Sequence, residues 1–482
     1  MTDSPQPLTA SKPRRGSLKV LFLTVFIDLV GFSIIFPLFP DMLEHYLEHD
    51  GVDSLVGRLA AWLQGLSGTT DPESQRLYTT ALFGGVLGSL YSVLQFIFAP
   101  IWGRLSDRTG RRPILLISIS GLAIAYVVWA FAGSFLLLVI SRLLAGLMGG
   151  NISVATAAVA DMTGTRDRAK GMGMIGAAFG LGFILGPAIG AMLSGIDLSG
   201  SLAGLNPFSA AALAAAGLSI GNLVWVALRF EETLPPQDRG SNPTHARSLN
   251  PLKLFTGDNL PPGVAATNLV FFLFQIAFAG MEFTLVFLAK ERLHYTARDM
   301  MWIFIFIGVL IALVQGGVVR RITPRFGEQR VTLWGLVMLV PGLLMVGWAQ
   351  STFPFYLGLG LLAVGSALVS PCLSAMVSLY TPSDRQGEVL GVFRSLGALS
   401  RAIAPIVAGL VYWKLGASWP YYGSALVMLV PLLLATRLPS PRRDSSPEMV
   451  HPDRETLAVD EPPAQPTQQR EDGEQQQDDR PA

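Results

Sequence analysis

The stretch Gly103-Arg-Leu-Ser-Asp-Arg-Thr-Gly-Arg-Arg-Pro113 is a short basic segment between two long apolar runs. The runs cover residues 81–102 and 114–132, and neither contains a charged side chain. Each is long enough to cross the roughly 30 Å hydrocarbon core of a bilayer. The segment is therefore predicted to be a tight turn between two membrane helices. Its arginines place it in the cytoplasm, because strongly basic loops are rarely translocated.

This turn contains residues that orientation in the membrane alone does not require. Orientation needs only positive charge, which comes from Arg104, Arg108, Arg111 and Arg112. Asp107 adds an acid among these arginines, while Gly103 and Gly110 give the backbone freedom to turn at both ends. An anchor needs neither the acid nor this spacing, so the pattern indicates a further role for the turn.

Composition predicts a membrane protein before any motif is considered. Hydrophobic residues make up 51% of the 482 residues and charged residues only 14%, against about 25% charged in soluble domains. The net charge of +1 argues against nucleic-acid binding. The lone Cys372 excludes a disulfide framework, and the histidines fall in predicted loops or tails, so neither a zinc site nor another cofactor is expected.

Apolar runs divide the chain into twelve predicted spans and several polar segments. The spans lie near residues 18–40, 79–102, 113–132, 135–160, 171–195, 207–229, 262–289, 300–319, 331–349, 353–380, 387–413 and 419–437. The polar segments are a disordered basic lead-in (1–17), a long outer loop (41–76), a cytoplasmic linker (230–261) and a disordered tail (438–482). The lead-in lacks the cleavage pattern of a signal peptide.

Charge distribution predicts that both termini are cytoplasmic. Most Lys and Arg residues outside the spans fall on that side, whereas the loop 41–76 is acidic. Within that loop, Leu55, Leu59, Trp62, Leu63 and Leu66 recur at helical spacing, which predicts an amphipathic helix at the outer interface. Three cations disagree with the pattern, because they fall in the predicted outer loop between spans seven and eight: Lys290, Arg292 and Arg298.

The two halves of the chain look like repeats of one another. Arg104-x-x-x-Arg108-x-Gly110 recurs as Arg321-x-x-x-Arg325-x-Gly327, although Pro324 replaces Asp107 in the second copy. The sequence therefore predicts an all-α membrane protein with two pseudo-symmetric six-helix bundles, 18–229 and 262–437. Bundles of this kind hold a substrate between the halves, near the middle of the membrane.

The turn from Gly103 to Pro113 resembles the signature loop between the second and third helices of the major facilitator superfamily. The first span, Asp28-Leu-Val-Gly31 to Pro40, and the fifth span resemble the drug/proton antiporter branch. The fifth span carries the residues Gly176, Gly180, Gly182, Gly186, Pro187 and Gly190. Close helix packing also explains glycines at this spacing, but packing does not require the Gly186-Pro187 step.

Wider similarity from Leu77 to about Leu193, and around Gly280 to Leu285, resembles the tetracycline-transporter-like branch. Animal members of that branch are associated with export of organic anions and drugs. The resemblance implies a non-enzymatic, proton-coupled exporter that works by rocking of its halves, in the plasma (inner) membrane. Its expected partners are membrane lipid, a small-molecule substrate and protons, and the protein is expected to be a monomer.

Five ionisable residues fall inside predicted spans: Asp28, Arg142, Glu282, Arg394 and Arg401. Each costs a few kcal/mol at membrane depth and therefore needs a partner or a function. Asp28 and Arg142 form either a structural ion pair or a proton site, since a low-dielectric cavity favours the neutral form of a carboxyl group. Glu282 is a second candidate for substrate or proton binding. Arg394 and Arg401 share a helical face, which suits an anionic substrate or pairs with neighbouring helices.

The resemblance also implies a role for the cytoplasmic turn. Asp107 would contact the start of span eleven near Gly387, while Arg111 would pair with Asp161 at the inner end of span four. Such a latch would hold the halves together when the cavity faces outward. Two alternatives to proton-coupled export remain at this point: a facilitative or importing transporter of a small solute, and a transporter-like receptor or scaffold.

Overall fold

The computed structural model describes residues 15–51, 53–66, 71–163, 165–201, 204–239, 260–382 and 386–439. In this part of the chain the regular structure is helical, and twelve helical segments are long and apolar enough to cross a membrane. The predicted all-α architecture with twelve spans is therefore confirmed. The predictions for residues 1–14, for the linker segment 240–259 and for the tail from residue 440 onward lie outside the described residues.

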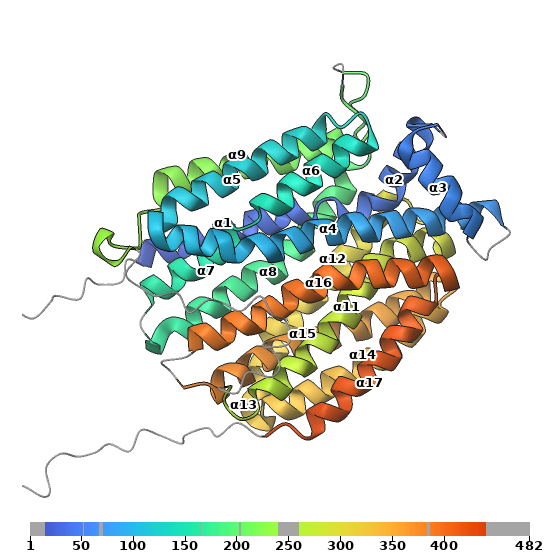
Figure 1. Cartoon of the computed structure of the whole chain (residues 1–482). Helices are drawn as coiled ribbons and strands as arrows, with labels where there is room; N and C mark the ends of the chain where they lie inside the picture. The colour runs from blue at the N-terminus through green and yellow to red at the C-terminus, as the bar shows by residue number, and fades with distance from the viewer. Residues whose placement is uncertain are drawn as a thin grey trace, which may run out of the picture. The chain divides into compact units, whose positions relative to one another are not determined.

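The amino-terminal half supplies the first six spans (Figure 1). They are α1 (Arg15–Ser33) continued by η1 (Phe36–Leu38) and α2 (Phe39–His49), α4 (Pro72–Thr109), α5 (Arg111–Ala130), α6 (Phe135–Met148) with α7 (Asn151–Met162), α8 (Thr165–Leu193) and α9 (Ser209–Arg229). The amphipathic helix predicted between the first two spans is confirmed as α3 (Leu55–Leu66). A short turn of helix, η2 (Pro236–Asp238), follows the sixth span.

The carboxy-terminal half supplies the other six spans. They are α11 (Val264–Leu293), α12 (Ala297–Leu313) continued by the π-helical η3 (Val314–Val319) and α13 (Arg320–Phe326), α14 (Glu328–Trp348), α15 (Thr352–Tyr380), α16 (Gln386–Leu415) and α17 (Trp419–Thr436). Most of these bounds differ from the predicted ones by a few residues. The largest extension among these six is at the carboxy-terminal end of span eight, where the helix continues beyond residue 319 to Phe326.

The predicted outer loop 41–76 is mostly helical, which corrects the sequence-based boundary. Its first residues belong to α2, because the first span continues to His49. Its last residues form the first turn of α4. That helix begins at Pro72 because the Asp71 side chain accepts a hydrogen bond from the Ser74 N–H at 2.9 Å and caps the helix. Hydrogen bonds from the Ser74 side chain and from its backbone N–H lower the pKa of the Asp71 carboxyl group below its usual value.

The basic turn is also more helical than predicted. α4 continues to Thr109 and α5 begins at Arg111, so Gly110 alone separates them, with φ of 109°. Gly327 separates α13 from α14 in the second half with φ of 83° and nearly the same ψ, 156° against 157°. Only glycine adopts this conformation without strain. The repeat predicted from the sequence is therefore visible in the backbone at these two turns.

The main contacts between the halves come from two helix pairs. α4 packs against α16, and α8 packs against α12 (Figure 1). In the first pair the backbones approach closely through glycine, since a Cβ on Gly409 would lie 3.0 Å from the Ala81 carbonyl oxygen and one on Gly85 would meet the Pro405 carbonyl. Small residues at such crossings allow dispersion contacts that drive helix association in lipid.

Apolar side chains are distributed as expected for a protein in lipid. Leu228 and Phe353 are 77% and 78% exposed, so large apolar groups face outward from the bundle. Cys372, the only cysteine of the chain, is buried in α15 with its Sγ 3.9 Å from Oγ1 of Thr323. The polar and charged side chains of the spans lie mainly inside, as the cost of placing them in hydrocarbon requires.

Candidate functional site

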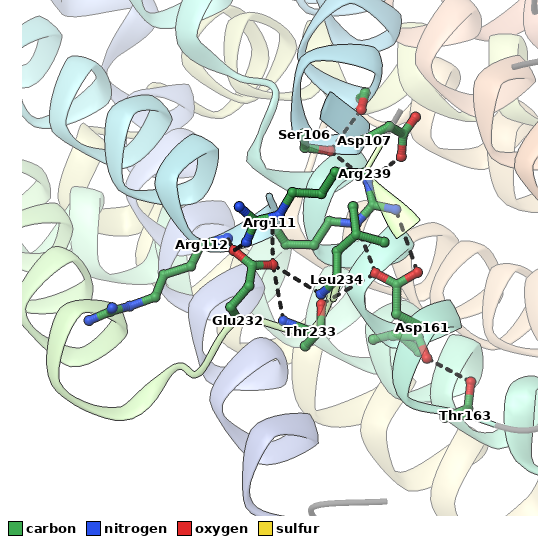
Figure 2. A network of polar contacts seen from close by, with 12 residues as sticks. Ser106, Asp107, Arg111, Arg112, Asp161, Thr163, Glu232, Thr233, Leu234 and Arg239 are labelled. Atoms are coloured by element: carbon green, nitrogen blue, oxygen red, sulfur yellow. Dashed lines mark hydrogen bonds and ion pairs between the residues drawn. The ribbon is translucent and has the colours of Figure 1, made fainter. Parts of the chain in front are cut away.

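Arg111 is the centre of a polar network at the end of α4 that carries the basic turn (Figure 2). Its buried side chain donates from Nε to Oδ2 of Asp161 at 2.8 Å. Its Nη1 donates to Oγ of Ser106 at 2.7 Å and to Oδ1 of Asp107 at 2.5 Å. The contact between Arg111 and Asp161 that the resemblance implies is therefore present. It ties the start of α5 to the end of α7 and to the last turns of α4.

Glu232 completes this network and was not identified from the sequence. Its carboxylate accepts hydrogen bonds from the backbone N–H groups of Arg111 at 2.8 Å and Arg112 at 3.1 Å. These are unpaired donors at the start of α5, where the helix dipole stabilises a negative charge. The position of Glu232 in the sequence could have indicated this contact, because Glu232 directly follows a span that ends on the same side as the basic turn.

The remaining residues of the turn have distinct surroundings. Arg112 donates from Nη2 to the Ala227 carbonyl at 2.6 Å, whereas the side chain of Arg108 is exposed. Gly103 lies within α4, and a Cβ there would be 3.3 Å from Oγ of Ser153. Gly103 therefore serves close packing between α4 and α7. The prediction that it frees the backbone for a turn is wrong, and Gly110 alone has that role.

The predicted contact between Asp107 and the start of span eleven is not tested. Residues 383–385 precede α16 and lie outside the described residues, as do the side chains of residues 386–388, which include Gly387. Asp107 itself is 36% exposed and pairs with Arg111. Its acceptor capacity is larger than this single bond uses, because a carboxylate has about four lone-pair sites.

Asp28 and Arg142 are both buried, at 5% and 2% exposure, but they do not form an ion pair within 4.0 Å of each other. The structural ion pair considered from the sequence is therefore contradicted for these two described residues. The Arg142 guanidinium instead lies over the rings of Trp129 and Tyr126, with Cζ 4.9 Å and 5.8 Å from their centroids. Cation–π attraction thus replaces the expected carboxylate partner.

The polar side chain next to the Asp28 carboxyl group is Asn151, the first residue of α7. The hydroxyl groups of Tyr91 and Tyr126 are also within range of the Asp28 charge. These groups come from α4, α5 and α7, so four helices of the first half meet around one carboxyl group. Nothing in the local sequence of Asn151 indicated this contact.

The second half contributes Glu282 on α11 and Arg394 and Arg401 on α16. The charges of Glu282 and Arg401 attract each other, although no ion pair within 4.0 Å joins these two described residues. The Arg401 guanidinium lies 5.7 Å from the ring centroid of Phe179 on α8. A cation of one half therefore contacts an aromatic ring of the other half. Arg394 lies two turns earlier on α16 and is partly buried.

The glycines of span five fall into two groups. A Cβ on Gly186 would overlap Ser33, the last residue of α1, and one on Gly190 would overlap Ile34, which follows it, so both positions allow close packing. A Cβ on Gly176 or Gly180 would meet nothing within 4 Å. Close packing therefore accounts for the outer glycines but not for these two. α8 continues without a break through Pro187.

At the opposite end of the molecule, charged side chains join the two halves directly. Lys290 of α11 donates to Oδ1 of Asp41 at 2.5 Å and to Oε2 of Glu44 at 2.7 Å, both on α2. Glu44 also pairs with Arg76 at 3.4 Å. Lys290 was one of the three cations that disagreed with the charge pattern of the outer loops, and these acids neutralise it. The pairing joins segments distant in the chain, so sequence spacing gave no signal for it.

A second contact of this kind involves Glu291. Its carboxylate accepts a hydrogen bond from the Tyr412 hydroxyl on α16 at 2.7 Å and from the Tyr78 hydroxyl on α4 at 3.4 Å. Tyr78 belongs to the first half, whereas Glu291 and Tyr412 belong to the second. Together with the Lys290 pairs, these bonds close the end of the molecule that carries α2 and α3.

Comparisons with known proteins agree with this architecture. The family model described as Major Facilitator Superfamily matches residues 21–326 and 321–465. The Mus musculus protein named major facilitator superfamily domain-containing protein 10 is 37% identical over 464 residues, which cover 92% of this chain and 98% of that protein. The class C tetracycline resistance protein of Escherichia coli is 30% identical over 428 residues, with 89% and 97% covered.

Solved structures give the same result. The crystal structure of the human organic anion transporter MFSD10 (TETRAN) superposes with a TM-score of 0.71 at 35% identity and covers 88% of this chain and 100% of that one. An inward-facing bacterial homolog of the human lysosomal transporter Spinster superposes with a TM-score of 0.62, covering 91% of this chain and 100% of that one. Its 13% identity supports a shared fold alone.

Proposed function

The chain belongs to the major facilitator superfamily of membrane transporters, and from this premise we propose that it exports amphipathic organic anions in exchange for protons. It is an integral, multi-pass membrane protein whose family moves small molecules. The proposal adds the substrate class, the direction and the coupling ion. It also places the protein in the plasma (inner) membrane with both termini in the cytoplasm, as the distribution of basic residues indicates.

An anionic substrate is supported by the buried cations between the helices. Arg142 in the first half and Arg401 in the second both lie over aromatic rings, and no carboxylate in the described part of the chain pairs with either within 4.0 Å. Such cations retain charge that a bound anion can neutralise. The human structural relative, an organic anion transporter, points to the same class.

Proton coupling is supported by one observation above the others, the burial of Asp28 without an ion-pair partner among the described residues. A lone carboxylate at membrane depth is costly, and protonation removes that cost. Proton binding at Asp28 would therefore stabilise a state in which the carboxyl group is shielded from water. Glu282, near Arg401, is the second candidate for this role.

Alternating access is supported by contacts at both ends. The outer end carries ion pairs that join α2 to α11, and the inner end carries the network around Arg111. In the proposed cycle, the outer pairs break when the cavity opens outward, and Asp107 then latches the inner end onto the start of α16. The halves would rock about the close crossings of α4 with α16 and of α8 with α12.

A flux experiment in proteoliposomes tests the proposal. The purified protein is reconstituted in vesicles with an acidic interior, and the membrane potential is clamped with potassium and valinomycin. A permanently charged amphipathic sulfonate is supplied outside, so that pH-dependent trapping of a weak acid plays no part. The proposal expects accumulation of the sulfonate above its outside concentration, and loss of that accumulation when nigericin collapses the pH gradient.

Three results would contradict parts of the proposal. Equal sulfonate uptake with and without the gradient would identify a facilitative transporter. Accumulation of an amphipathic quaternary ammonium compound in place of the sulfonate would overturn the anion preference. No flux of either probe above that of protein-free vesicles would favour a receptor or scaffold.

A further inference from the structure

Span four is broken in its middle, at Gly149 and Gly150. α6 ends at Met148 and α7 begins at Asn151, and the N–H of Gly150 bonds to the carbonyl of Met148 at 2.7 Å instead of continuing the helical pattern. Figure 1 labels the two segments separately. Irregular backbone at membrane depth is tolerated only where other protein groups satisfy it. The break therefore needs partners.

Side chains from two other helices supply these partners. Trp102 of α4 donates from Nε1 to the Leu147 carbonyl at 2.7 Å, and Ser118 of α5 donates to the Met148 carbonyl. Gln95 of α4 donates from Nε2 to the Gly149 carbonyl at 3.1 Å. Each of these three carbonyl groups at the break thus accepts a hydrogen bond from a side chain. This indicates that the break is part of the fold.

Close packing explains why residue 150 is a glycine. A Cβ on Gly150 would overlap the Trp102 ring. A Cβ on Gly149 would lie 3.0 Å from Nε2 of Gln95 and 3.1 Å from the Tyr91 hydroxyl, both of them ends of flexible side chains. Position 149 can therefore accept alanine with small adjustments, whereas position 150 cannot.

The break makes α7 a separate segment with a functional group at each end. Its first residue, Asn151, adjoins Asp28, and Asp161 in its last turn binds Arg111 of the cytoplasmic network. A helix of 12 residues is about 18 Å long, so α7 spans the distance between the buried carboxyl group and the turn. It packs on α1, α4 and α5 along the way.

Asn151 is suited to respond to the charge of Asp28. Its side chain is 2% exposed, and its Oδ1 already accepts a bond from the Ile152 N–H at 2.9 Å. Its Nδ2 makes no hydrogen bond of full geometry with any described residue, and the Asp28 carboxyl group lies beside it, within reach of that amide. A hydrogen bond to a carboxylate is roughly twice as strong as one to a neutral acid. The free donor therefore favours contact with Asp28 when Asp28 is ionised.

Other charged and titratable groups around Asp28 do not replace this contact. Tyr91 on α4 and Tyr126 on α5 face it, and Arg142 on α6 and Arg401 on α16 act on Tyr91. α8 and α9 also pack on α1, but residues 174–193 and 209–228 contain no charged side chain. Asn151 is therefore the group near Asp28 that belongs to the segment ending at the cytoplasmic network.

We propose that Asn151 is the positioning residue through which the charge state of Asp28 reaches the Arg111–Asp161 contact, with Gly149 and Gly150 as the hinge. Ionised Asp28 holds the start of α7 through Nδ2 of Asn151. Protonation weakens that bond, α7 moves about the hinge, and Asp161 changes its hold on Arg111. This inference rests on the proposed proton coupling at Asp28 and assigns the residues that transmit it.

The test compares two matched asparagines in the proteoliposome assay. Asn151→Leu removes the amide beside Asp28, and Asn222→Leu removes another buried amide that bonds to α1, at the Thr24 carbonyl one turn away. The measured quantity is the accumulation ratio of the sulfonate with and without the pH gradient. We expect this ratio to fall to about that of gradient-free vesicles for Asn151→Leu, and to stay within about twofold of the unmodified protein for Asn222→Leu.

A third variant tests the hinge separately. Gly149→Ala stiffens the break, and we expect it to slow exchange by several fold while the final accumulation ratio is kept.

The variant Asn151→Gln keeps an amide donor. An accumulation ratio in this variant close to that of the unmodified protein would support the positioning role. Equal ratios for Asn151→Leu and Asn222→Leu, or loss of gradient-free exchange together with the ratio in Asn151→Leu, would overturn it. If the unmodified protein shows no gradient response, the proposed proton coupling is wrong, and transmission of the Asp28 charge through Asn151 is overturned with it.

Discussion

Lys290 and Asp41 form an ion pair between the two halves of the protein, with 2.5 Å between Nζ and Oδ1. Lys290 also binds Glu44, so one cation of α11 connects to two acids of α2. The side chains are only partly exposed, at 28% for Lys290 and 39% for Asp41. This contact must break whenever the outer ends of the halves separate, which makes it a means of setting the balance between states.

The variant Lys290→Gln tests that balance. Partly exposed pairs contribute up to about 1 kcal/mol, so their loss should favour the outward-open state about fivefold. The apparent affinity for the sulfonate offered at the outer face should rise by up to that factor, and the effect should shrink at high salt. Arg58→Gln, an exposed cation on α3, is the charge-matched control. An unchanged outer affinity in Lys290→Gln would contradict a gating role.

The variant Asp107→Asn tests the inner latch. It removes the charge that bonds to Arg111 but leaves Asp161 in place, so the protein should fold and insert normally. Hydrogen bonds to charged groups contribute about 1.5–3 kcal/mol, and transport should slow about tenfold or more. The neighbouring exposed Arg108→Gln serves as control. Equal flux in both variants would reduce the turn to a topology anchor.

The variant Glu232→Gln tests the cap on α5. A carboxylate at a helix start contributes about 0.3–1 kcal/mol, so the melting temperature in detergent should fall by about 2 °C while transport direction is unchanged. Glu231→Gln, the adjacent acid, is the control. A larger fall for Glu231→Gln than for Glu232→Gln would show that the cap does not stabilise the folded protein.

The variant Asp28→Asn tests the coupling site. Asparagine keeps the size and hydrogen-bonding capacity of the side chain but cannot release or bind the proton. A pH gradient should therefore no longer drive uphill accumulation, while downhill exchange persists at a measurable rate. Accumulation that survives in this variant would transfer the coupling role to Glu282, which Glu282→Gln would then test in the same vesicles.

Orientation is tested with fused reporters. A reporter after Arg443 should be cytoplasmic and one inserted near Gly68 should be external, since an odd number of spans separates these positions. Protease protection of intact cells distinguishes the two sides. Both reporters on one side would contradict the twelve-span topology.

The spans were predictable from the sequence because a segment that crosses a membrane must be apolar along its whole length. The run from Arg111 to Ala130, for example, is continuous in hydropathy and ends within two residues of its prediction. Gly110 was also predictable, since a backbone with φ of 109° requires glycine. Both features depend on residues that are neighbours in the sequence.

The missed features all depend on contacts between distant segments. Lys290 forms ion pairs with acids of the other half, and Glu232, which lies beyond the sixth span, accepts a hydrogen bond from the start of α5. The break in span four was missed because Gly149 and Gly150 in an apolar run are compatible with packing as well as with interruption. The ion pair of Asp28 with Arg142, one of the two alternatives that the sequence left open, is not formed because the aromatic rings of Tyr126 and Trp129 hold the guanidinium instead.

The burial of Cys372 has a practical consequence for following these motions. A thiol that is 1% exposed and lies beside Thr323 is poorly accessible to water-soluble maleimides and methanethiosulfonates. Because it is the only cysteine in the chain, a second one introduced at an exposed position becomes the single labelling site without prior removal of the native residue. A spin label or fluorophore can thus be attached at one chosen position at a time, for example at either end of α4, in an otherwise unaltered protein.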